Sequence, residues 1–361
     1  MSRGPRVWPE VLNALLGDHL VLARPGPQPG QRLQVLDPLA AWVWQSARSG
    51  LGDAAIAALL SDHFGRPLAQ VQADVAALLA GWEEAAPTVW TVCLADRRIA
   101  VRVDDPDLAD RLGALLPPPA GASARAPDTC LYLAGTANDW HLAVDERIVT
   151  TGRTLADALL SSRAALLAAG SDAPRRLIVP HAAGVSRAGQ GVLLIGAGGA
   201  GKSTLATALN ADGWDWLGDD AIAVTLEGQL LGLGLGPCLR AGSWPALAPW
   251  MPGLEQVPVV PRRPEPVRLP SPPGPCEAGP VPTAAFLVIR YRPGERPALE
   301  PLAPVAVLQA MLAAEAVLPV LDQARLEALT RWIAAAPGFT LTYPDLSAAL
   351  DLAAGLGIGE A

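Results

Sequence analysis

The sequence predicts an α/β protein with two domains: a small winged-helix-like domain over residues 1–88, and a larger domain with a mixed β-sheet over residues 89–361. Two observations indicate this. A glycine-rich stretch at residues 196–201 separates an apolar run from a helical pattern, and residues 20–82 combine two short strand patterns with three short helical patterns. A chain of 361 residues accommodates both, because domains commonly span about 100–200 residues.

Composition excludes several classes of protein. The chain is 51% hydrophobic and 17% charged, so it can bury a sizeable core. Its formal net charge of −8 argues against nucleic-acid binding and against binding to anionic membranes. We see no signal-peptide core and no uninterrupted apolar stretch that predicts a membrane span. The four cysteines are scattered without a C-x-x-C pair, so we expect a cytoplasmic protein with reduced thiols.

The first domain begins with strands expected at residues 20–23 and 32–36, around a Pro/Gly turn at residues 25–30. Asp37 and Pro38 are typical of an N-cap and a first helical position, so a helix starts there. Two more helices are expected over residues 52–64 and 67–82. Apolar spacing predicts that these helices bury Leu39, Trp42, Val43, Ile56, Leu59, Leu60, Val71, Val75, Leu78, Leu79 and Trp82.

The charge of this domain argues against DNA binding, because six arginines and eight acidic residues give a net charge of 6 − 8 = −2 over residues 1–88. The pattern of residues 36–82 resembles the PqqD-like peptide-recognition domains of ribosomal-peptide modification pathways. The resemblance implies that a leader peptide adds as a strand at the sheet edge near residues 20–36, beside the helix near residues 70–82. A small helical dimerisation or packing domain is the alternative.

The second domain begins with a β-rich part over residues 89–175 and continues as a core over residues 176–361. The β-rich part has four short apolar strand patterns and then a helix over residues 155–169. In the core, Glu227-Gly228 lies between two apolar runs and predicts a hairpin, hence a mixed sheet. Further strands are expected at residues 176–180, 192–195, 214–217, 284–291 and 339–343. Helices are expected at residues 305–317 and 321–336, and Asp345 caps a final helix. Ten of the 25 residues from 258 to 282 are proline, which predicts an extended loop.

The stretch Gly196–Ser203, GAGGAGKS, matches the phosphate-loop pattern G-x-x-x-x-G-K-[ST] at every position. Its place between a strand and a helix N-terminus predicts an anion site made of backbone N–H groups. Lys202 is the only lysine in the chain, and its compact ammonium fits between β- and γ-phosphates where a planar guanidinium would not. We therefore expect ATP and Mg²⁺ to bind, with Mg²⁺ on the Ser203 hydroxyl. The expected nucleotide-binding residues are Gly196, Gly198, Gly199, Ala200, Gly201, Lys202, Ser203 and Thr204.

Three further positions are candidates for chemistry on the γ-phosphate. Asp219 and Asp220 follow a short strand, where one carboxylate would bind Mg²⁺ and a second would take a proton from a hydroxyl. His181 ends the strand that precedes the phosphate loop, and it is either catalytic or structural. Arg240 lies in the glycine-rich segment at residues 232–244; we expect it to be a surface arginine rather than a phosphate ligand.

A second resemblance covers roughly residues 130–355 and is strongest at 176–225. A strand ending in His181, the loop GAGGAGKST, a helix ending at Gly213 and the sequence LGDD resemble the catalytic domain of HPr kinase/phosphorylase. The C-terminal FTLTYPDLSAAL resembles the same group. The resemblance implies a P-loop serine kinase in which Lys202 is catalytic, one of Asp219 and Asp220 is the base, the other binds metal, and His181 supports the base. Which aspartate has which role stays open; we favour Asp219 as the base and Asp220, with Ser203, as the metal ligand.

Two features depart from that family. Thr204 stands where HPr kinases usually have glutamate, and residues 230–290 lack the later Glu-Ile-Arg signature with its glycine-bearing segment. In that family the signature is tied to the phosphorylase reaction and to recognition of HPr. The resemblance therefore implies neither of these for this chain.

Together, the two resemblances predict an ATP-dependent kinase that phosphorylates a serine or threonine hydroxyl on a ribosomally made peptide or a small carrier protein. Capture of the leader by the first domain would raise the local concentration of the target. Two alternatives remain: an ATP-binding peptide chaperone or scaffold without phosphotransfer, and a kinase of a free small molecule such as serine. Relatives with this fold are often oligomers, so the resemblance also allows a homo-oligomer.

Overall fold

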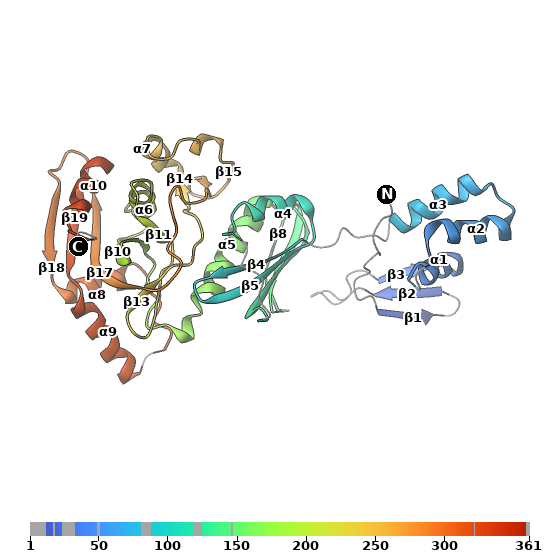
Figure 1. Ribbon diagram of the computed structural model, residues 1–361, viewed down its shortest axis with the longest axis horizontal. Helices are drawn as coiled ribbons and strands as arrows, with labels where there is room; N and C mark the ends of the chain where they lie inside the picture. The colour runs from blue at the N-terminus through green and yellow to red at the C-terminus, as the bar shows by residue number, and fades with distance from the viewer. Residues whose placement is uncertain are drawn as a thin grey trace.

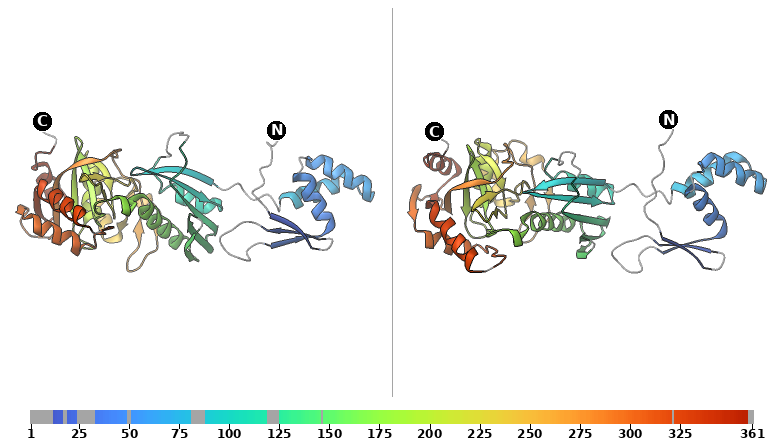
Figure 2. Two further views of the ribbon diagram at one scale, coloured as in Figure 1. Left: turned by 90° about the horizontal axis from the view of Figure 1, so that it is seen from below. Right: turned by 60° about the horizontal axis from the view of Figure 1, so that its bottom comes forward.

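The computed structural model describes residues 12–16, 19–23, 33–48, 51–80, 88–118, 125–145, 147–320 and 322–358. The architecture is mixed α/β, with an eight-stranded sheet, a five-stranded sheet and two three-stranded sheets in these residues. Figures 1 and 2 show the five-stranded sheet between the N-terminal elements and the eight-stranded sheet. Within the described residues, every helix is too short or too polar to cross a membrane. The predicted turn at residues 25–30 and the side chain of Trp82 lie outside them.

The N-terminal unit is a three-stranded antiparallel sheet followed by three helices. Its elements are β1 (Leu12–Leu16), β2 (His19–Ala23), β3 (Leu33–Leu36), α1 (Pro38–Arg48), α2 (Asp53–Phe64) and α3 (Leu68–Ala80). The three predicted helices are present, and β1 is a strand that the sequence pattern did not indicate. As predicted, Asp37 caps α1, because its side chain accepts a hydrogen bond from the Ala40 N–H at 2.8 Å.

The prediction of buried residues was wrong at three positions in these helices: Leu39, Trp42 and Leu59 are exposed. The buried face of α1 instead carries Val43 and Trp44, with Ala40 and Ala47 at its margins, which is the i, i+3, i+4, i+7 spacing of one helix face. Trp44 therefore occupies the core position that Trp42 was expected to take. The other buried residues of this unit are Leu20, Leu36, Ala41, Ile56, Ala57, Leu60, Val71, Val75 and Leu79.

The five-stranded sheet has the order β4 (Thr88–Leu94), β5 (Arg97–Val103), β6 (Thr129–Thr136), β7 (Asp139–Val144) and β8 (Arg147–Gly152). Only the β5–β6 pair is parallel, and α4 (Pro106–Gly113) connects these two strands. Helix α5 (Leu155–Ser171) shares a core with this sheet. The sequence analysis missed β8 and α4, although Asp105 and Pro106 repeat the start signal of Asp37 and Pro38.

The eight-stranded sheet confirms the predicted mixture of parallel and antiparallel strands. Strands β10 (Gln190–Ile195), β17 (Val281–Tyr291) and β19 (Gly338–Tyr343) pair in parallel. Antiparallel strands lie on both sides of them: β9 (Ala183–Arg187), β11 (Asp215–Gly218), β12 (Ala223–Val224), β13 (Gln229–Leu231) and β18 (Ala298–Leu302). The path runs β11-β9-β10-β17, so the carboxyl ends of β11, β10, β17 and β19 lie at one edge.

Helices cover both faces of this sheet. Helices α6 (Lys202–Ala211) and α10 (Leu346–Ala354) pack on one face, and α8 (Pro304–Ala313) and α9 (Gln323–Ala335) on the other. Successive strand residues point to opposite faces. Accordingly, Val192 and Leu194 of β10 join the core with α6, whereas Leu193 and Ile195 join the core with α8 and α9.

The structure tests two further predictions about the core. The strand expected at residues 176–180 is reduced to isolated bridges of Ile178 with Val224 and of Val179 with Val317. The proline-rich segment at residues 258–282 has no helix, as predicted. It contributes only β15 (Val259–Val260), β16 (Val267–Arg268) and the first residues of β17; β16 lies between β15 and β14 (Leu239–Arg240) in a small sheet.

Candidate functional site

The glycine-rich loop, residues 196–201, joins the carboxyl end of β10 to the N-terminus of α6. Gly199 and Gly201 have φ values of 85° and 98°, a region that residues with side chains rarely adopt. A Cβ on Gly201 would also lie 3.0 Å from the Tyr343 Oη. Because glycines carry no side chain, a ligand can approach the backbone of this loop closely. The first N–H groups of α6 lack partners within the helix, so an anion such as phosphate suits this place.

Lys202 is buried at the base of this loop. Its Nζ donates hydrogen bonds to the Gly196 carbonyl at 2.7 Å and to the Ala197 carbonyl at 3.3 Å. Burial lowers the pKa of the Lys202 ammonium, while the Asp219 and Asp220 carboxylates act in the opposite direction. A phosphate oxygen at the loop would offer this ammonium a charged partner in place of two neutral carbonyls, which strengthens the hydrogen bond.

Asp219 lies directly after β11 and contacts the first turn of α6. The Ser203 hydroxyl donates to Asp219 Oδ1 at 2.8 Å, and the Cys238 N–H donates to Oδ2 at 3.0 Å. Asp219 is 1% exposed, and burial beside the Asp220 carboxylate raises its pKa to about 6. The Ser203 hydroxyl and the Asp219 carboxylate in contact, with the Asp220 carboxylate next in the chain, are oxygen donors that fit Mg²⁺, which commonly takes one or two carboxylates plus substrate phosphates. Larger groups of three or more His, Cys, Asp and Glu suited to a metal are absent from the described residues.

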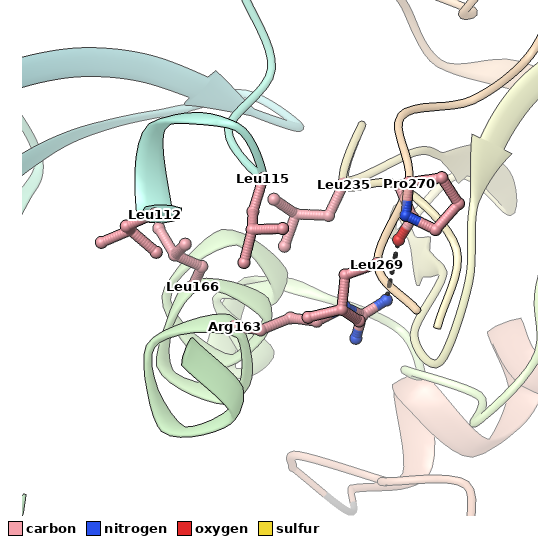
Figure 3. Close-up of a pocket in the computed structure, with 8 residues that line it drawn as sticks. Leu112, Leu115, Arg163, Leu166, Leu235, Leu269 and Pro270 are labelled. Atoms are coloured by element: carbon pink, nitrogen blue, oxygen red, sulfur yellow. Dashed lines mark hydrogen bonds between the residues drawn. The ribbon is translucent and has the colours of Figure 1, made fainter. Parts of the chain in front are cut away.

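Asp220 is held by an arginine that sequence reasoning did not identify. Arg163 of α5 donates to Asp220 Oδ2 at 2.6 Å and to the Gly236 carbonyl at 3.0 Å. Arg163 is buried and lines a small cavity of about 10 Å³ together with leucines of three segments (Figure 3). Asp220 adopts a φ of 69°, which is uncommon for a residue with a side chain. The ion pair with Arg163 holds the Asp220 carboxylate, while the Asp220 side chain stays 33% exposed.

His181 and Arg240 lie at the same edge. Burial lowers the pKa of His181, the Lys202 ammonium lowers it further, and Asp220 is the carboxylate that opposes this most. The imidazole is therefore neutral at pH 7. Arg240 was expected to be a surface residue, and its side chain is 42% exposed. Its Nη1 would lie 3.7 Å from a Cβ placed on Gly199. It is thus beside the glycine-rich loop, where it also faces Glu265 at 3.9 Å.

The structure therefore brings together Lys202, Ser203, Asp219, Asp220 and His181 from three separate segments. The other predicted nucleotide-binding residues, Gly196, Gly198, Gly199, Ala200, Gly201 and Thr204, lie in the loop and the first turn of α6. The space next to Gly198 is open. Compared with models of known protein families and with curated proteins, the chain matches none. The two family resemblances stay predictions.

The buried charge of Asp219 predicts how the stability of the metal-free protein depends on pH. Because its folded-state pKa of about 6 exceeds the ordinary value of 3.8, the folded state binds the proton more tightly than the unfolded state. This contribution to stability is complete below about pH 4 and is lost as the pH rises through about 6. We expect Asp219→Asn, which cannot ionise, to raise the free energy of unfolding at pH 8 by up to about 3 kcal/mol.

Thermal unfolding with EDTA at pH 4 and pH 8 measures this. The difference between Asp219→Asn and the unaltered protein should be large at pH 8 and nearly vanish at pH 4. An equal difference at both values would show that the Asp219 pKa is not raised.

Proposed function

We propose that this chain is an ATP-dependent kinase that transfers the γ-phosphoryl group to a serine or threonine hydroxyl. One observation carries the proposal: the Ser203 hydroxyl lies 2.8 Å from the Asp219 carboxylate, and Ser203 follows the glycine-rich loop and Lys202 directly. Phosphoryl transfer needs a cradle for the phosphates, a cation site and a carboxylate for the acceptor proton, and this edge of the sheet has all three.

The contacts favour exchanging the roles that the sequence suggested for the two aspartates. Asp219 is fully buried against Ser203, so these two residues would hold Mg²⁺. Mg²⁺ held there would neutralise negative charge on the phosphate oxygens. The Asp220 side chain is 33% exposed and is the carboxylate with the largest effect on His181. Asp220 can therefore reach an incoming hydroxyl and act as the base, with His181 beside it.

In this scheme the acceptor hydroxyl oxygen bonds to the γ-phosphorus, and its proton passes to Asp220. The bond from the γ-phosphorus to the bridging oxygen breaks, and ADP leaves with that oxygen. Lys202 and Arg240 supply positive charge to the transferring oxygens. Arg163 contacts neither substrate, but it holds the Asp220 carboxylate in position.

We further propose that the N-terminal unit captures the leader of a ribosomally made peptide or a small carrier protein. Within the described residues, β3 pairs only with β2, so its outer backbone groups can accept another strand. Val35 of β3 is 58% exposed, and Leu39 and Trp42 of α1 are exposed after it in the chain. An exposed apolar side chain on a strand with an unpaired edge, followed in the chain by two more, supports peptide binding at β3.

Substitution at this edge tests the capture step. We expect Val35→Asp to raise the KM for a leader-bearing peptide about fivefold, because it removes one apolar cross-strand contact. The turnover of a leaderless acceptor should stay unchanged. Leu15→Asp is the control, since Leu15 lies on β1 at the opposite edge and is 72% exposed. Equal effects of both substitutions would contradict capture at β3.

The kinase itself is tested with purified protein, γ-labelled ATP, Mg²⁺ and peptides encoded beside the gene. A peptide that gains the mass of one phosphate on a hydroxyl residue is the expected result. ATP binding with no labelled acceptor would indicate the nucleotide-binding scaffold instead. Labelling of free serine, with no dependence on a leader, would indicate a small-molecule kinase.

A further inference from the structure

A cavity of about 480 Å³ opens beside the glycine-rich loop, on the side away from the aspartates. The loop residues 196–200 form one wall, the carboxyl end of β17 at residues 288–292 forms a second, and Ala310 and Ala313 of α8 contribute a third. The volume falls within the range of about 300–1,000 Å³ that is common for small-molecule sites. The carboxyl ends of parallel strands are also where ligands bind in open α/β sheets.

The topology places this cavity and the aspartates on opposite sides of β10. Strand β9 separates β10 from β11, which ends at Asp219 and Asp220, whereas β17 is the neighbour on the other side. The γ-phosphate of a bound triphosphate has to face the aspartates, because the proton acceptor and the Ser203–Asp219 pair are there. The remainder of the ligand therefore extends from the loop toward β17 and the cavity.

The walls of the cavity suit a flat, uncharged ring. Tyr291 is 50% exposed, and its ring packs against the Tyr343 ring with centroids 5.7 Å apart. Tyr343 is buried under Gly201, and its carbonyl accepts the Arg292 N–H at 2.9 Å, so Tyr291 is supported from behind. The side chains of Ala310 and Ala313 are small enough to leave space for a ring. The exposed Arg290 and Arg292 add positive charge on the way to the phosphates.

We propose that this cavity binds the base of the nucleoside triphosphate, which stacks on Tyr291 and lies against Ala310 and Ala313. The proposal rests on the proposed function, since it assumes that the triphosphate lies in the glycine-rich loop. Aromatic side chains bind planar bases by stacking, and this contact tolerates different bases. Tyr291 and α8 are therefore the elements that distinguish a nucleotide from a bare polyphosphate.

Calorimetry with ATP and with inorganic triphosphate, both in Mg²⁺, tests this without measuring turnover. The unaltered protein should bind ATP more tightly than inorganic triphosphate. Tyr291→Ala should weaken ATP binding about tenfold, the effect of losing one stacking contact, and leave triphosphate binding unchanged. Tyr291→Phe is the matched control, because it keeps the ring and should bind ATP normally. Ala313→Leu fills the cavity and should also weaken only ATP binding.

The outcomes separate the two proposals. If neither ATP nor triphosphate binds the unaltered protein, the proposed function fails and this inference fails with it. If ATP binds but Tyr291→Ala and Ala313→Leu leave its affinity unchanged, the triphosphate site stands and the base lies elsewhere. If both substitutions instead raise the KM of the peptide acceptor and leave ATP affinity unchanged, the cavity belongs to the acceptor, which also overturns the inference.

Discussion

Lys202→Ala is expected to lower phosphate transfer about 10³-fold or more and to weaken ATP binding strongly. The ammonium of Lys202 is buried within hydrogen-bonding distance of the loop carbonyls of Gly196 and Ala197. No other lysine exists in the chain to replace it. Transfer measured with γ-labelled ATP, together with calorimetric ATP binding, gives both quantities.

Two variants sharpen this result. Lys202→Arg keeps the positive charge but introduces a wide planar group into a buried position, so we expect it to be nearly as inactive. Arg331→Ala removes an exposed charge on α9 and should behave as the unaltered protein. A thermal unfolding curve confirms that each variant is folded. Transfer that survives in folded Lys202→Ala would rule out the glycine-rich loop as the site of phosphoryl transfer.

Asp220→Asn is the second substitution with a large expected effect, a fall in turnover of about 10²–10⁴-fold with ATP binding nearly unchanged. The reason is that Asp220 would accept the proton of the acceptor hydroxyl, a step that follows nucleotide binding. Asp219→Asn should instead raise the Mg²⁺ concentration needed for half-maximal nucleotide binding, because it removes a charged oxygen beside Ser203. Rapid-mix measurements of transfer and Mg²⁺ titrations of binding separate the two effects.

Arg163 supplies a control for the role of Asp220. Arg163→Gln should lower turnover more than it raises the Mg²⁺ requirement, since Arg163 forms an ion pair with Asp220 and acts on Asp219 only through its charge. Arg163→Lys keeps the charge and should recover part of the lost turnover. If Asp219→Asn abolishes turnover and Asp220→Asn raises the Mg²⁺ requirement, the original sequence-based assignment of the two aspartates is the correct one.

The sequence predicted those parts of the site that depend on neighbouring residues. The glycine-rich loop, β10, α6 and the turn at Gly213 are encoded within about 25 consecutive residues by apolar runs, glycines and one lysine. The approach of one of the two aspartates to Ser203 was also expected, because a strand that follows α6 and lies parallel to β10 must end at the same edge of the sheet. The sequence analysis placed Asp220 beside Ser203, whereas the structure places Asp219 there.

The parts that sequence reasoning missed depend on contacts between distant segments. Arg163 lies 57 residues before Asp220, on helix α5, which packs on the five-stranded sheet. The residues around Arg163 in the sequence do not indicate that it forms an ion pair with Asp220. Tyr343 reaches Gly201 only because β19 pairs with β17. In α1, Trp42 and Trp44 are almost equally good candidates for burial, and only the packing of three helices on the sheet decides between them.

The β-rich part and the core share one apolar interior, although residue 176 marks a change in sequence pattern. Side chains of β4 to β7 and α5 form a single cluster with Leu235, Cys238, Val260, Val267 and Leu269. Arg176 also pairs with Asp96 across the same boundary. A fragment that starts at residue 176 would expose this interior and leave Asp220 without Arg163. The smallest fragment that keeps the candidate site intact therefore starts at β4. A chimaera with another protein has to exchange these two sheets together.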